Sequence, residues 1–157
     1  MSEGIIIAII GAGVCAILSS IGSIIGVLMG GRAAAGVVSE KPELFGKVLL
    51  LQALPGTQGF YGFIVAVLMA LQLGIFEGNL ATLTTAQGWA YFGAAMPAAL
   101  ILLISAIYQG KVAVSAIHMT AKQPDASGKG VTMTALVETY AILGLLTSII
   151  IIFGLPK

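Results

Sequence analysis

The segments "EKPELFGK" at residues 40–47 and "KQPDASGK" at residues 122–129 are two versions of one polar loop, 82 residues apart. Each loop separates two long apolar stretches of the chain. The same gapless offset aligns further identical residues: Ala53 and Leu54 with Ala135 and Leu136, Thr57 with Thr139, and Gly62 with Gly144. The sequence therefore predicts two tandem copies of one hairpin unit, both in the same orientation.

The composition places these apolar stretches in a membrane. Of the 157 residues, 59% are hydrophobic and 8% are charged, whereas soluble domains carry about 25% charged residues. Four segments are long enough to cross a bilayer core of about 30 Å, at residues 4–31, 47–76, 87–121 and 130–154. A transmembrane β-barrel would need alternating apolar and polar residues. We therefore expect an all-α membrane protein of two helical hairpins, residues 1–81 and residues 82–157.

The basic residues predict how the hairpins cross the membrane. They flank the two polar loops, as Arg32, Lys41 and Lys47 at the first and Lys111, Lys122 and Lys129 at the second. The connection at residues 77–87 has Glu77 but neither Lys nor Arg. By the positive-inside rule, both loops are expected to be cytoplasmic, with both termini outside the cell membrane. Three aromatic residues are then expected to anchor the third segment at the outer interface: Trp89, Tyr91 and Phe92.

Composition and motifs argue against several other functions. The net charge of +1 does not provide the basic surface that a nucleic acid requires. Cys15 is the only cysteine, so we expect it to serve packing and not a disulfide or zinc site. "GAGVCA" at residues 11–16 lies inside an apolar segment, without the strand that a dinucleotide-binding motif needs. We expect no cofactor and no catalytic site, and a structural or interfacial role for His118.

The first apolar segment carries a face of small residues. Gly22, Gly26 and Gly30 follow one another at four-residue spacing, with Ser19 and Ser23 beside them. In lipid, small residues on one helical face let two backbones approach closely. This helix is expected to have tightly packed neighbours, and four helices are few for a transport protein. We therefore predict a homo-oligomer and assign the three glycines to packing within it.

One acidic residue stands out, because Glu138 is the only acid well inside an apolar segment. A charged side chain at the centre of a bilayer costs roughly 2.5–3.5 kcal/mol on insertion scales. A functional site is therefore the leading interpretation of Glu138. The alternative is a protonated carboxyl that only forms a hydrogen bond between helices.

Other polar residues in the apolar segments are candidates to join Glu138. Leu54, Thr57, Gln58 and Tyr61 follow the i, i+3, i+4, i+7 pattern of one helical face. Gln109 is a second amide within an apolar segment. At about 1.5 Å per residue, Gln58, Gln109 and Glu138 lie roughly 14–20 Å from the lysines that flank the polar loops. These side chains are expected to lie at one depth in the membrane.

The chemistry of these residues distinguishes a sodium site from a proton site. A proton site needs little beyond one carboxylate, whereas Na⁺ needs several oxygen ligands to replace its hydration shell. A hydroxyl, two amide oxygens and a carboxylate oxygen provide four ligands, and a backbone carbonyl would provide a fifth. Pro55 has no N–H, so it leaves the Leu51 carbonyl without its helical partner. Gly56 and Gly59 would ease the local distortion.

Three motifs carry a resemblance to a known family: "LPGTQGFYGF" at residues 54–63, "YQGKVAV" at residues 108–114 and "VETYAILG" at residues 137–144. In this order across four segments, they resemble the rotor-ring proteolipid (K or c subunit) of bacterial V-type, or V/A-type, sodium-transporting ATPases. The resemblance covers essentially the whole chain. It implies a ring of identical subunits in the membrane, which carries ions past a stator subunit with an essential arginine. Soluble subunits hydrolyse ATP and drive the rotation.

The resemblance also implies roles for single residues. The implied Na⁺ ligands are the Leu54 carbonyl, in place of Leu51, together with Thr57, Gln58, Gln109 and Glu138. Tyr61 would donate a hydrogen bond to the carboxylate. The first and third segments would form the inner wall of the ring, surrounded by membrane lipid, and the cytoplasmic loops would contact a central-stalk subunit. The charged residues near those loops are Arg32, Glu40, Lys41, Lys122 and Asp125.

Two other functions are compatible with parts of the sequence. A proton-carrying ring of the same family would leave Thr57, Gln58 and Gln109 as buried polar groups without a purpose. A small four-span cation-coupled antiporter has its essential acid in the first segment and no internal duplication. A purely structural membrane scaffold leaves Glu138 unexplained. The repeat adds one feature, since Glu138 aligns with Gly56, and the first hairpin therefore lacks an acid at the matching position.

Overall fold

The computed structural model describes residues 2–156, and its regular structure is helical throughout. The elements are α1 (Glu3–Glu40), the 3₁₀ turn η1 (Pro42–Leu44), α2 (Phe45–Ala53), the 3₁₀ turn η2 (Leu54–Gly56), α3 (Thr57–Gln72), α4 (Thr85–Lys122), the 3₁₀ turn η3 (Pro124–Ala126) and α5 (Ser127–Gly154). Within the described residues, four continuous helical segments are long and apolar enough to cross a membrane. The prediction of an all-α membrane fold is confirmed.

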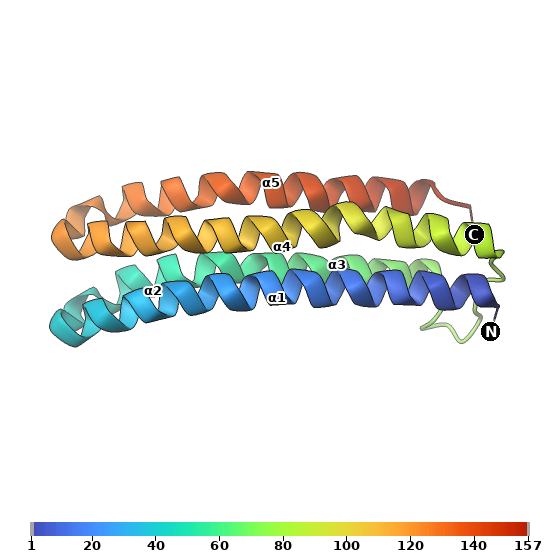
Figure 1. Cartoon of the computed structure of the whole chain (residues 1–157), viewed down its shortest axis with the longest axis horizontal. Coiled ribbons are helices and arrows are strands. Elements are labelled where there is room, and N and C mark those ends of the chain that lie inside the picture. The colour runs from blue at the N-terminus through green and yellow to red at the C-terminus, as the bar shows by residue number, and fades with distance from the viewer. Residues whose placement is uncertain (1, 157) are drawn as a thin grey trace.

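The two halves of the chain fold alike. α1 and α4 both have 38 residues, and their bounds differ by the same 82-residue offset as the polar loops. η1 and η3 obey this offset as well. Figure 1 shows the two hairpins side by side, with the polar loops at one end and both termini at the other. A 38-residue helix is about 57 Å long, so α1 and α4 extend beyond a bilayer core, as the sequence indicates.

The connection between the hairpins begins earlier than expected. The second segment was expected to reach residue 76, but α3 ends at Gln72. Gly74 and Gly78 have φ angles of 72° and 67°, a left-handed conformation that ends a helix. Ala81 N–H then donates to the Leu73 carbonyl at 3.0 Å. The next helix begins with a capping box, in which the Thr84 hydroxyl accepts a hydrogen bond from Gln87 N–H.

The glycine face of α1 packs against the second hairpin of the same chain. A Cβ atom added to Gly22 would lie 2.6 Å from the Leu103 carbonyl oxygen, and one added to Gly110 would lie 2.6 Å from the Gly26 Cα. Gly30 faces the backbone of Gln52, also in the same chain. The tight neighbours are therefore α4 and α2. These three glycines form close contacts within one chain.

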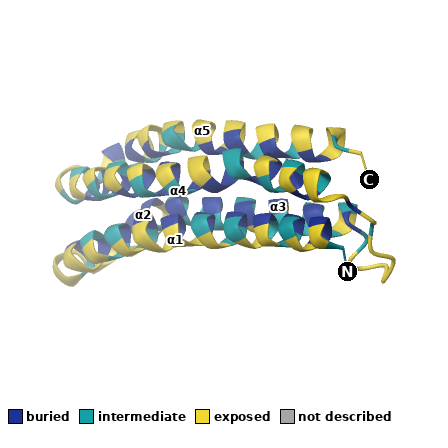
Figure 2. Cartoon of the chain, turned by 45° about the vertical axis from the view of Figure 1, so that its right-hand side comes forward, coloured by how far each residue is buried: buried dark blue, intermediate teal, exposed yellow. Residues whose placement is uncertain are grey.

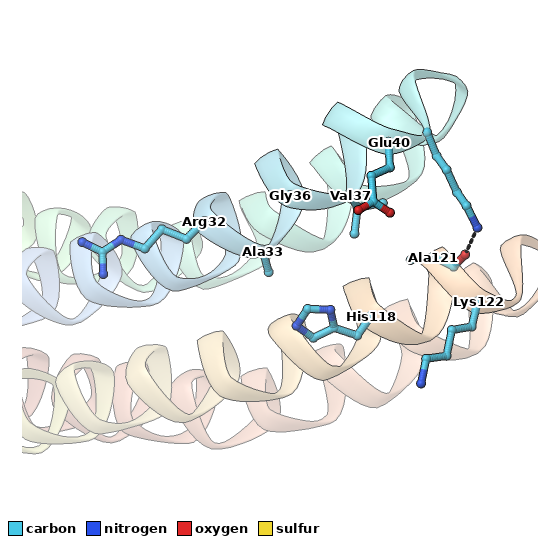
Figure 3. A pocket seen from close by; sticks show the side chains of 9 residues that line it. Arg32, Ala33, Gly36, Val37, Glu40, His118, Ala121 and Lys122 are labelled. Carbon is cyan, nitrogen blue, oxygen red and sulfur yellow. Dashed lines mark hydrogen bonds between the residues drawn. The ribbon is translucent and has the colours of Figure 1, made fainter.

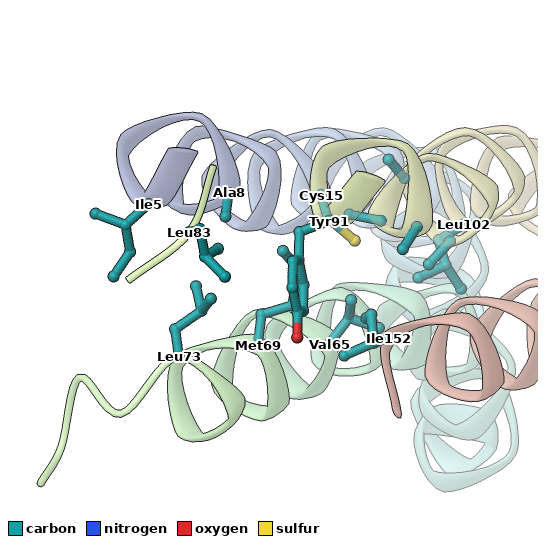
Figure 4. Close-up of a cluster of buried hydrophobic side chains, with 14 of the residues drawn as sticks. Ile5, Ala8, Cys15, Val65, Met69, Leu73, Leu83, Tyr91, Leu102 and Ile152 are labelled. Atoms are coloured by element: carbon teal, nitrogen blue, oxygen red, sulfur yellow. The ribbon is translucent and has the colours of Figure 1, made fainter. Parts of the chain in front are cut away.

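A buried apolar cluster joins all four helical segments at the end that holds the termini. It includes Val65 and Met69 of α3, Leu102 of α4 and Ile152 of α5 (Figure 4). Cys15 is fully buried in this cluster, in agreement with a packing role.

Tyr91 lies in the same cluster and is only 1% exposed, so its predicted role as an interfacial anchor is wrong. Its side chain points between the helices (Figure 4), and its hydroxyl lies 3.5 Å from the Pro156 carbonyl. Trp89 is 58% exposed and its ring contacts Phe92 edge to face at 5.4 Å. Trp89 keeps the exposed position that an anchor requires, and Phe92 is half-buried beside it.

The outer surface of the hairpins is apolar. Large hydrophobic side chains of α3 and α5 are exposed, among them Phe60 at 71%, Leu136 at 63% and Ile150 at 71%. Figure 2 shows exposed residues along the outer sides of the helices and buried residues where the helices meet. Such a surface is unstable in water and fits the acyl chains of a bilayer.

The close contact between α1 and α4 predicts the effect of a single methyl group. We expect Gly26→Ala to destabilise the protein by about 1–3 kcal/mol, because the added atom would overlap the α4 backbone. Gly13→Ala is the matched control on the same helix, since an added Cβ at Gly13 meets no atom within 4 Å. Thermal unfolding in detergent, followed by circular dichroism, measures both variants. Equal unfolding temperatures for the two variants would contradict the packing argument.

Candidate ion-binding site

The site begins at a change of helix type between α2 and α3. Pro55 has no N–H to donate, and the chain forms the 3₁₀ turn Leu54–Gly56 at this point. The backbone angles stay helical, as at Leu54 with φ −52° and ψ −46°. The Thr57 N–H donates to the Leu54 carbonyl three residues earlier. The segment therefore continues in one direction, while its hydrogen bonds shift from the α to the 3₁₀ pattern.

Ser23 of α1 holds this turn from the neighbouring helix. The Gly59 N–H donates to Ser23 Oγ at 2.7 Å, and the Ser23 hydroxyl lies 3.3 Å from the Gly56 carbonyl oxygen. In a regular α-helix, the Gly59 N–H would donate to the Pro55 carbonyl. Ser23 therefore pairs two backbone groups beside the turn, in a region where water is scarce. The sequence identifies Ser23 only as a small packing residue, because the contact joins residues 36 positions apart.

Thr57 gathers oxygen atoms at the start of α3. Its hydroxyl lies 3.0 Å from the Leu54 carbonyl oxygen and 3.4 Å from Oε1 of Gln58. These three oxygen atoms therefore converge beside the 3₁₀ turn, as the shared helical face of the three residues predicts.

Two buried glutamine side chains connect this group to the second hairpin. Gln58 and Gln109 are both fully buried, and the Gln58 amide donates to Gln109 Oε1. Gln109 Nε2 lies 3.2 Å from the Thr134 carbonyl and 3.5 Å from Oε2 of Glu138. Each amide is therefore satisfied by another polar group of the cluster, which is the condition for burying it.

Glu138 of α5 completes the cluster from the far side. The Tyr61 hydroxyl donates to Oε1 of Glu138 at 2.6 Å, a short hydrogen bond of the kind a carboxylate accepts. The contact between Oε2 and Gln109 is much longer. Tyr61 therefore fixes one carboxylate oxygen and leaves the other directed at the amide and carbonyl groups.

The structure brings together all six residues that the sequence singled out around Glu138. One connected set of polar contacts joins η2, α3, α4 and α5, and its members are Leu54, Thr57, Gln58, Tyr61, Gln109 and Glu138. Leu51 is fully buried in the apolar cluster at the loop end. The Thr134 carbonyl is an additional member that no sequence pattern indicated. Backbone oxygens are available at every position, so only the fold selects one.

The cluster has the chemistry of a site for one small monovalent cation or one proton. It contains a single carboxylate among neutral oxygens. Among the described residues, no three His, Cys, Asp or Glu side chains are grouped in a way that could hold a metal ion. All of its groups come from one chain, and the two hairpins contribute to it jointly.

A cavity at the loop end is separate from this cluster. Its volume is about 760 Å³, and it lies between the ends of α1 and α4. Arg32, Glu40, His118 and Lys122 line it, and Lys41 Nζ donates to the Ala121 carbonyl at 2.6 Å beside it (Figure 3). The cavity gathers the charged residues that the sequence assigns to the cytoplasmic ends of the helices. None of the residues around Glu138 lines it.

The fold and the site define a membrane proteolipid of two hairpins with one buried carboxylate. The chain matches the family of the ATP synthase C subunit over residues 10–69 and again over residues 92–151. These two matches are offset by the same 82 residues as the polar loops. The chain belongs to this family.

Three relatives show how widely the likeness extends. The chain is 43% identical to the V-type sodium ATPase subunit K of Enterococcus hirae, over 96% of this chain and 93% of the relative. It is 39% identical to the A-type ATP synthase subunit K of Methanocaldococcus jannaschii, over 100% of this chain and 66% of the relative. It is 26% identical to the 16 kDa proteolipid of the V-type proton ATPase of Nephrops norvegicus, over 90% and 86%.

Family membership has three consequences for this chain. It is a multi-pass membrane protein, a member of an oligomeric ring within an ATPase complex, and a non-catalytic subunit of that complex. The small four-span antiporter and the structural scaffold are therefore excluded. The ion that the ring carries is a separate question, which depends on the cluster around Glu138.

The contacts of the Ser23 hydroxyl predict that the backbone beside the 3₁₀ turn depends on this side chain for its stability. We expect Ser23→Ala to destabilise the protein by about 1–3 kcal/mol, because it removes the side-chain oxygen that accepts a hydrogen bond from the half-buried Gly59 N–H. Ser19→Ala is the matched control one turn away, since the Ser19 hydroxyl donates only to Ala16 of its own helix. Hydrogen exchange followed by mass spectrometry should show faster exchange around Gly59 in Ser23→Ala alone. Equal exchange in the two variants would refute this role of Ser23.

Proposed function

We propose that this chain is the rotor-ring subunit of a V-type ATPase and carries Na⁺ across the membrane on Glu138. The ring turns as other subunits hydrolyse ATP. The observation that supports this proposal is the group of oxygen atoms beside the carboxylate: the Leu54 carbonyl, the Thr57 hydroxyl and the amides of Gln58 and Gln109.

The choice of Na⁺ over a proton follows from the number of neutral oxygen atoms gathered beside the carboxylate. A proton on Glu138 needs neither Gln58 nor Gln109, although both side chains are directed into the cluster. A sodium ion uses both, since an amide can turn its oxygen toward a cation by rotating about its last side-chain bond. One Na⁺ also cancels the single negative charge of the cluster. The name of the 43% identical relative, a sodium ATPase subunit, supports the same choice.

Tyr61 and the two glutamines then have distinct tasks. The Tyr61 hydroxyl holds Oε1 of Glu138 at 2.6 Å, so that Oε2 faces the ion. Gln58 and Gln109 contribute neutral oxygens, which replace water around the cation without adding charge. A loaded site is electrically neutral, and it can therefore face the acyl chains of the lipid at a low cost. An arginine of a stator subunit would stabilise the empty, charged carboxylate and release the ion.

The same proposal gives the chain its partners and its orientation. Identical copies form the ring, membrane lipid surrounds it, and the loops that contain residues 40–47 and 122–129 contact a central-stalk subunit. Both loops are cytoplasmic and both termini lie outside, as the distribution of basic residues indicates. Each hairpin thus enters and leaves the membrane on the outer side.

The number of ions per turn follows from the repeat. Gly56 occupies the position in the first hairpin that corresponds to Glu138 in the second. The four helices of one chain therefore carry one ion. A ring of equal circumference built from single hairpins with one acid each would carry twice as many ions per turn. Fewer ions per ATP allow pumping against a steeper gradient, which favours a pump over a synthase. A ring of about twice as many hairpins would contradict this conclusion.

The identity of the ion is testable on the purified ring by reaction with a carbodiimide. The reagent modifies a protonated carboxyl, so it should label Glu138 near neutral pH and label it much less when Na⁺ occupies the site. Mass spectrometry of the chain measures the labelled fraction as a function of Na⁺ concentration, with choline chloride as the ionic-strength control. Labelling that does not change even at high Na⁺ would establish the proton-carrying alternative instead.

The hydrogen bond from Tyr61 predicts a change in sodium affinity. We expect Tyr61→Phe to raise the Na⁺ concentration that halves carbodiimide labelling by roughly 10- to 100-fold, as is typical when a group that orients a metal ligand is lost. Tyr140→Phe is the control, since Tyr140 also lies in a membrane segment but is 65% exposed in the chain. It should leave the labelling curve unchanged. Equal curves for both variants would show that Tyr61 does not position the carboxylate.

A further inference from the structure

We propose that Thr134 is a positioning residue. Its backbone carbonyl holds the Gln109 amide with the nitrogen toward α5 and the oxygen toward the cation, so that Gln58 is the amide that turns over when the ion binds. This inference rests on the proposed function, because it concerns the ligands of Na⁺. It follows from the hydrogen-bonding capacity of the groups that surround each of the two amides.

The nitrogen of Gln109 faces two oxygen atoms that can only accept hydrogen bonds. Gln109 Nε2 lies 3.2 Å from the Thr134 carbonyl oxygen and 3.5 Å from Oε2 of Glu138. A backbone carbonyl and an ionised carboxylate have no hydrogen to donate. Turning the Gln109 amide over would place its own oxygen against both acceptors and leave a fully buried N–H group unpaired, which is costly. The Gln109 oxygen is therefore directed away from these two acceptors, in the empty site and in the loaded site alike.

The Thr134 carbonyl is a fixed point because it belongs to the backbone of a helix that packs closely on α4. One turn earlier, a Cβ added to Gly130 would lie 3.0 Å from the Cβ of Ala116. The Thr134 side chain is fully buried, and its hydroxyl donates to the Gly130 carbonyl at 2.8 Å. In an α-helix the Thr134 carbonyl also accepts the N–H of Glu138. One oxygen atom thus joins the Gln109 amide to the backbone of the acid.

Gln58 has partners of a different kind. Its Oε1 lies 3.4 Å from the Thr57 hydroxyl, which is closer to the Leu54 carbonyl, at 3.0 Å. A hydroxyl accepts as well as donates, so Thr57 tolerates either the oxygen or the nitrogen of Gln58 beside it. The Gln58 nitrogen donates to Gln109 Oε1, an oxygen that a bound cation would take. The first contact allows either direction of the Gln58 amide, and the second exists only while the cation is absent.

Binding of the cation therefore exchanges hydrogen bonds without leaving an amide unpaired. In the empty site the Gln58 nitrogen satisfies the Gln109 oxygen. When Na⁺ enters, the Gln109 oxygen already faces it, and Gln58 turns over to add an oxygen of its own. The Gln58 nitrogen then donates to the Thr57 hydroxyl, so that both buried amides keep their partners. Gln58 responds to occupancy, whereas Gln109 keeps one direction.

The internal repeat separates this arrangement from ordinary helix packing. The residues of the first hairpin that correspond to Gln109 and Thr134 are Val27 and Gln52. Valine offers no amide that the Gln52 carbonyl could orient, and Gly56 stands at the position of the acid. Of the two hairpins, the one that has the carboxylate is also the one that pairs a buried amide with a backbone carbonyl.

A weaker carbonyl tests the role of Thr134 in the purified ring. Nonsense suppression replaces Ala135 by lactic acid, which makes the Thr134 carbonyl an ester carbonyl and a poorer acceptor. We expect this ring to need roughly 10- to 100-fold more Na⁺ for half protection of Glu138 from carbodiimide, as when a group that orients a metal ligand is lost. The matched control replaces Met133 by its α-hydroxy analogue and weakens the carbonyl of Thr132, an exposed residue of the same helix. Each ester removes one N–H from α5, so a purely structural effect would be equal in the two rings.

Solid-state NMR tests the directions of the two amides in a ring with an unmodified backbone. With isotope-labelled threonine carbonyl carbons and glutamine side-chain nitrogens, we expect dipolar dephasing of Gln109 Nε2 by the Thr134 carbonyl, both without and with Na⁺. Thr134→Ser is the control, because it keeps the carbonyl and removes only the label. Na⁺ should shift the Nε2 resonance of Gln58, identified by its loss in Gln58→Asn, more than that of Gln109.

The outcomes distinguish the inference from the proposed function. If Na⁺ protects Glu138 in the unmodified ring but the two ester rings give equal protection curves, the inference fails and the proposed function stands. Dephasing of Gln109 that disappears on adding Na⁺, or a larger shift of Gln109 than of Gln58, would overturn the inference in the same way. The dephasing experiment decides if an ester ring does not assemble. If Na⁺ does not protect Glu138 in the unmodified ring, the proposed function fails, and the inference fails with it.

Discussion

The hydrogen bond from Tyr61 to Glu138 joins α3 of the first hairpin to α5 of the second at membrane depth. Much of the surrounding structure positions these two side chains. A carboxylate in an apolar segment is tolerated only with partners, and its own helix offers none. One partner is Tyr61 of the first hairpin, whose hydroxyl lies 2.6 Å from Oε1 of Glu138. The other is Gln109 of α4, in the second hairpin. A duplicated fold meets this need, because it places two equivalent helices on either side of a third.

The duplication has also allowed the sequences of the two hairpins to diverge. The second hairpin has the acid and the amide, Glu138 and Gln109, and the first has Gly56 and Val27 at those positions. Conversely, the first hairpin has Gln58 and Tyr61, and the second has Tyr140 and Leu143 at the corresponding positions. Neither hairpin alone could form the cluster. One complete site therefore requires two hairpins, and this is the physical reason why four helices act as one unit.

The sequence predicts the repeat, the helical fold and the members of the polar cluster, because each depends on local spacing or on the cost of burying a charge. It does not predict contacts that depend on how helices pack. The Ser23 bond to Gly59 and the Thr134 carbonyl are of this kind. Tyr91 is a similar case, since its position in sequence is that of an interfacial anchor and only the packing of α3 and α5 buries it. The end of α3 at Gln72 depends on Gly74, whose left-handed conformation no periodicity reveals.

The glycine contacts connect the packing of the inner helices to the geometry of the ion site. Gly110 meets the Gly26 backbone at the point where Gln109 enters the cluster, and Ser23 lies one turn before Gly26. The close approach of α1 and α4 thus sets two distances at once: that of Ser23 from the 3₁₀ turn, and that of Gln109 from Gln58. A larger residue at Gly26 would move α4 away from α1 and carry Gln109 with it. The small residues of α1 therefore act on the site without contacting an ion, and their effect on packing and their effect on ion binding have the same cause.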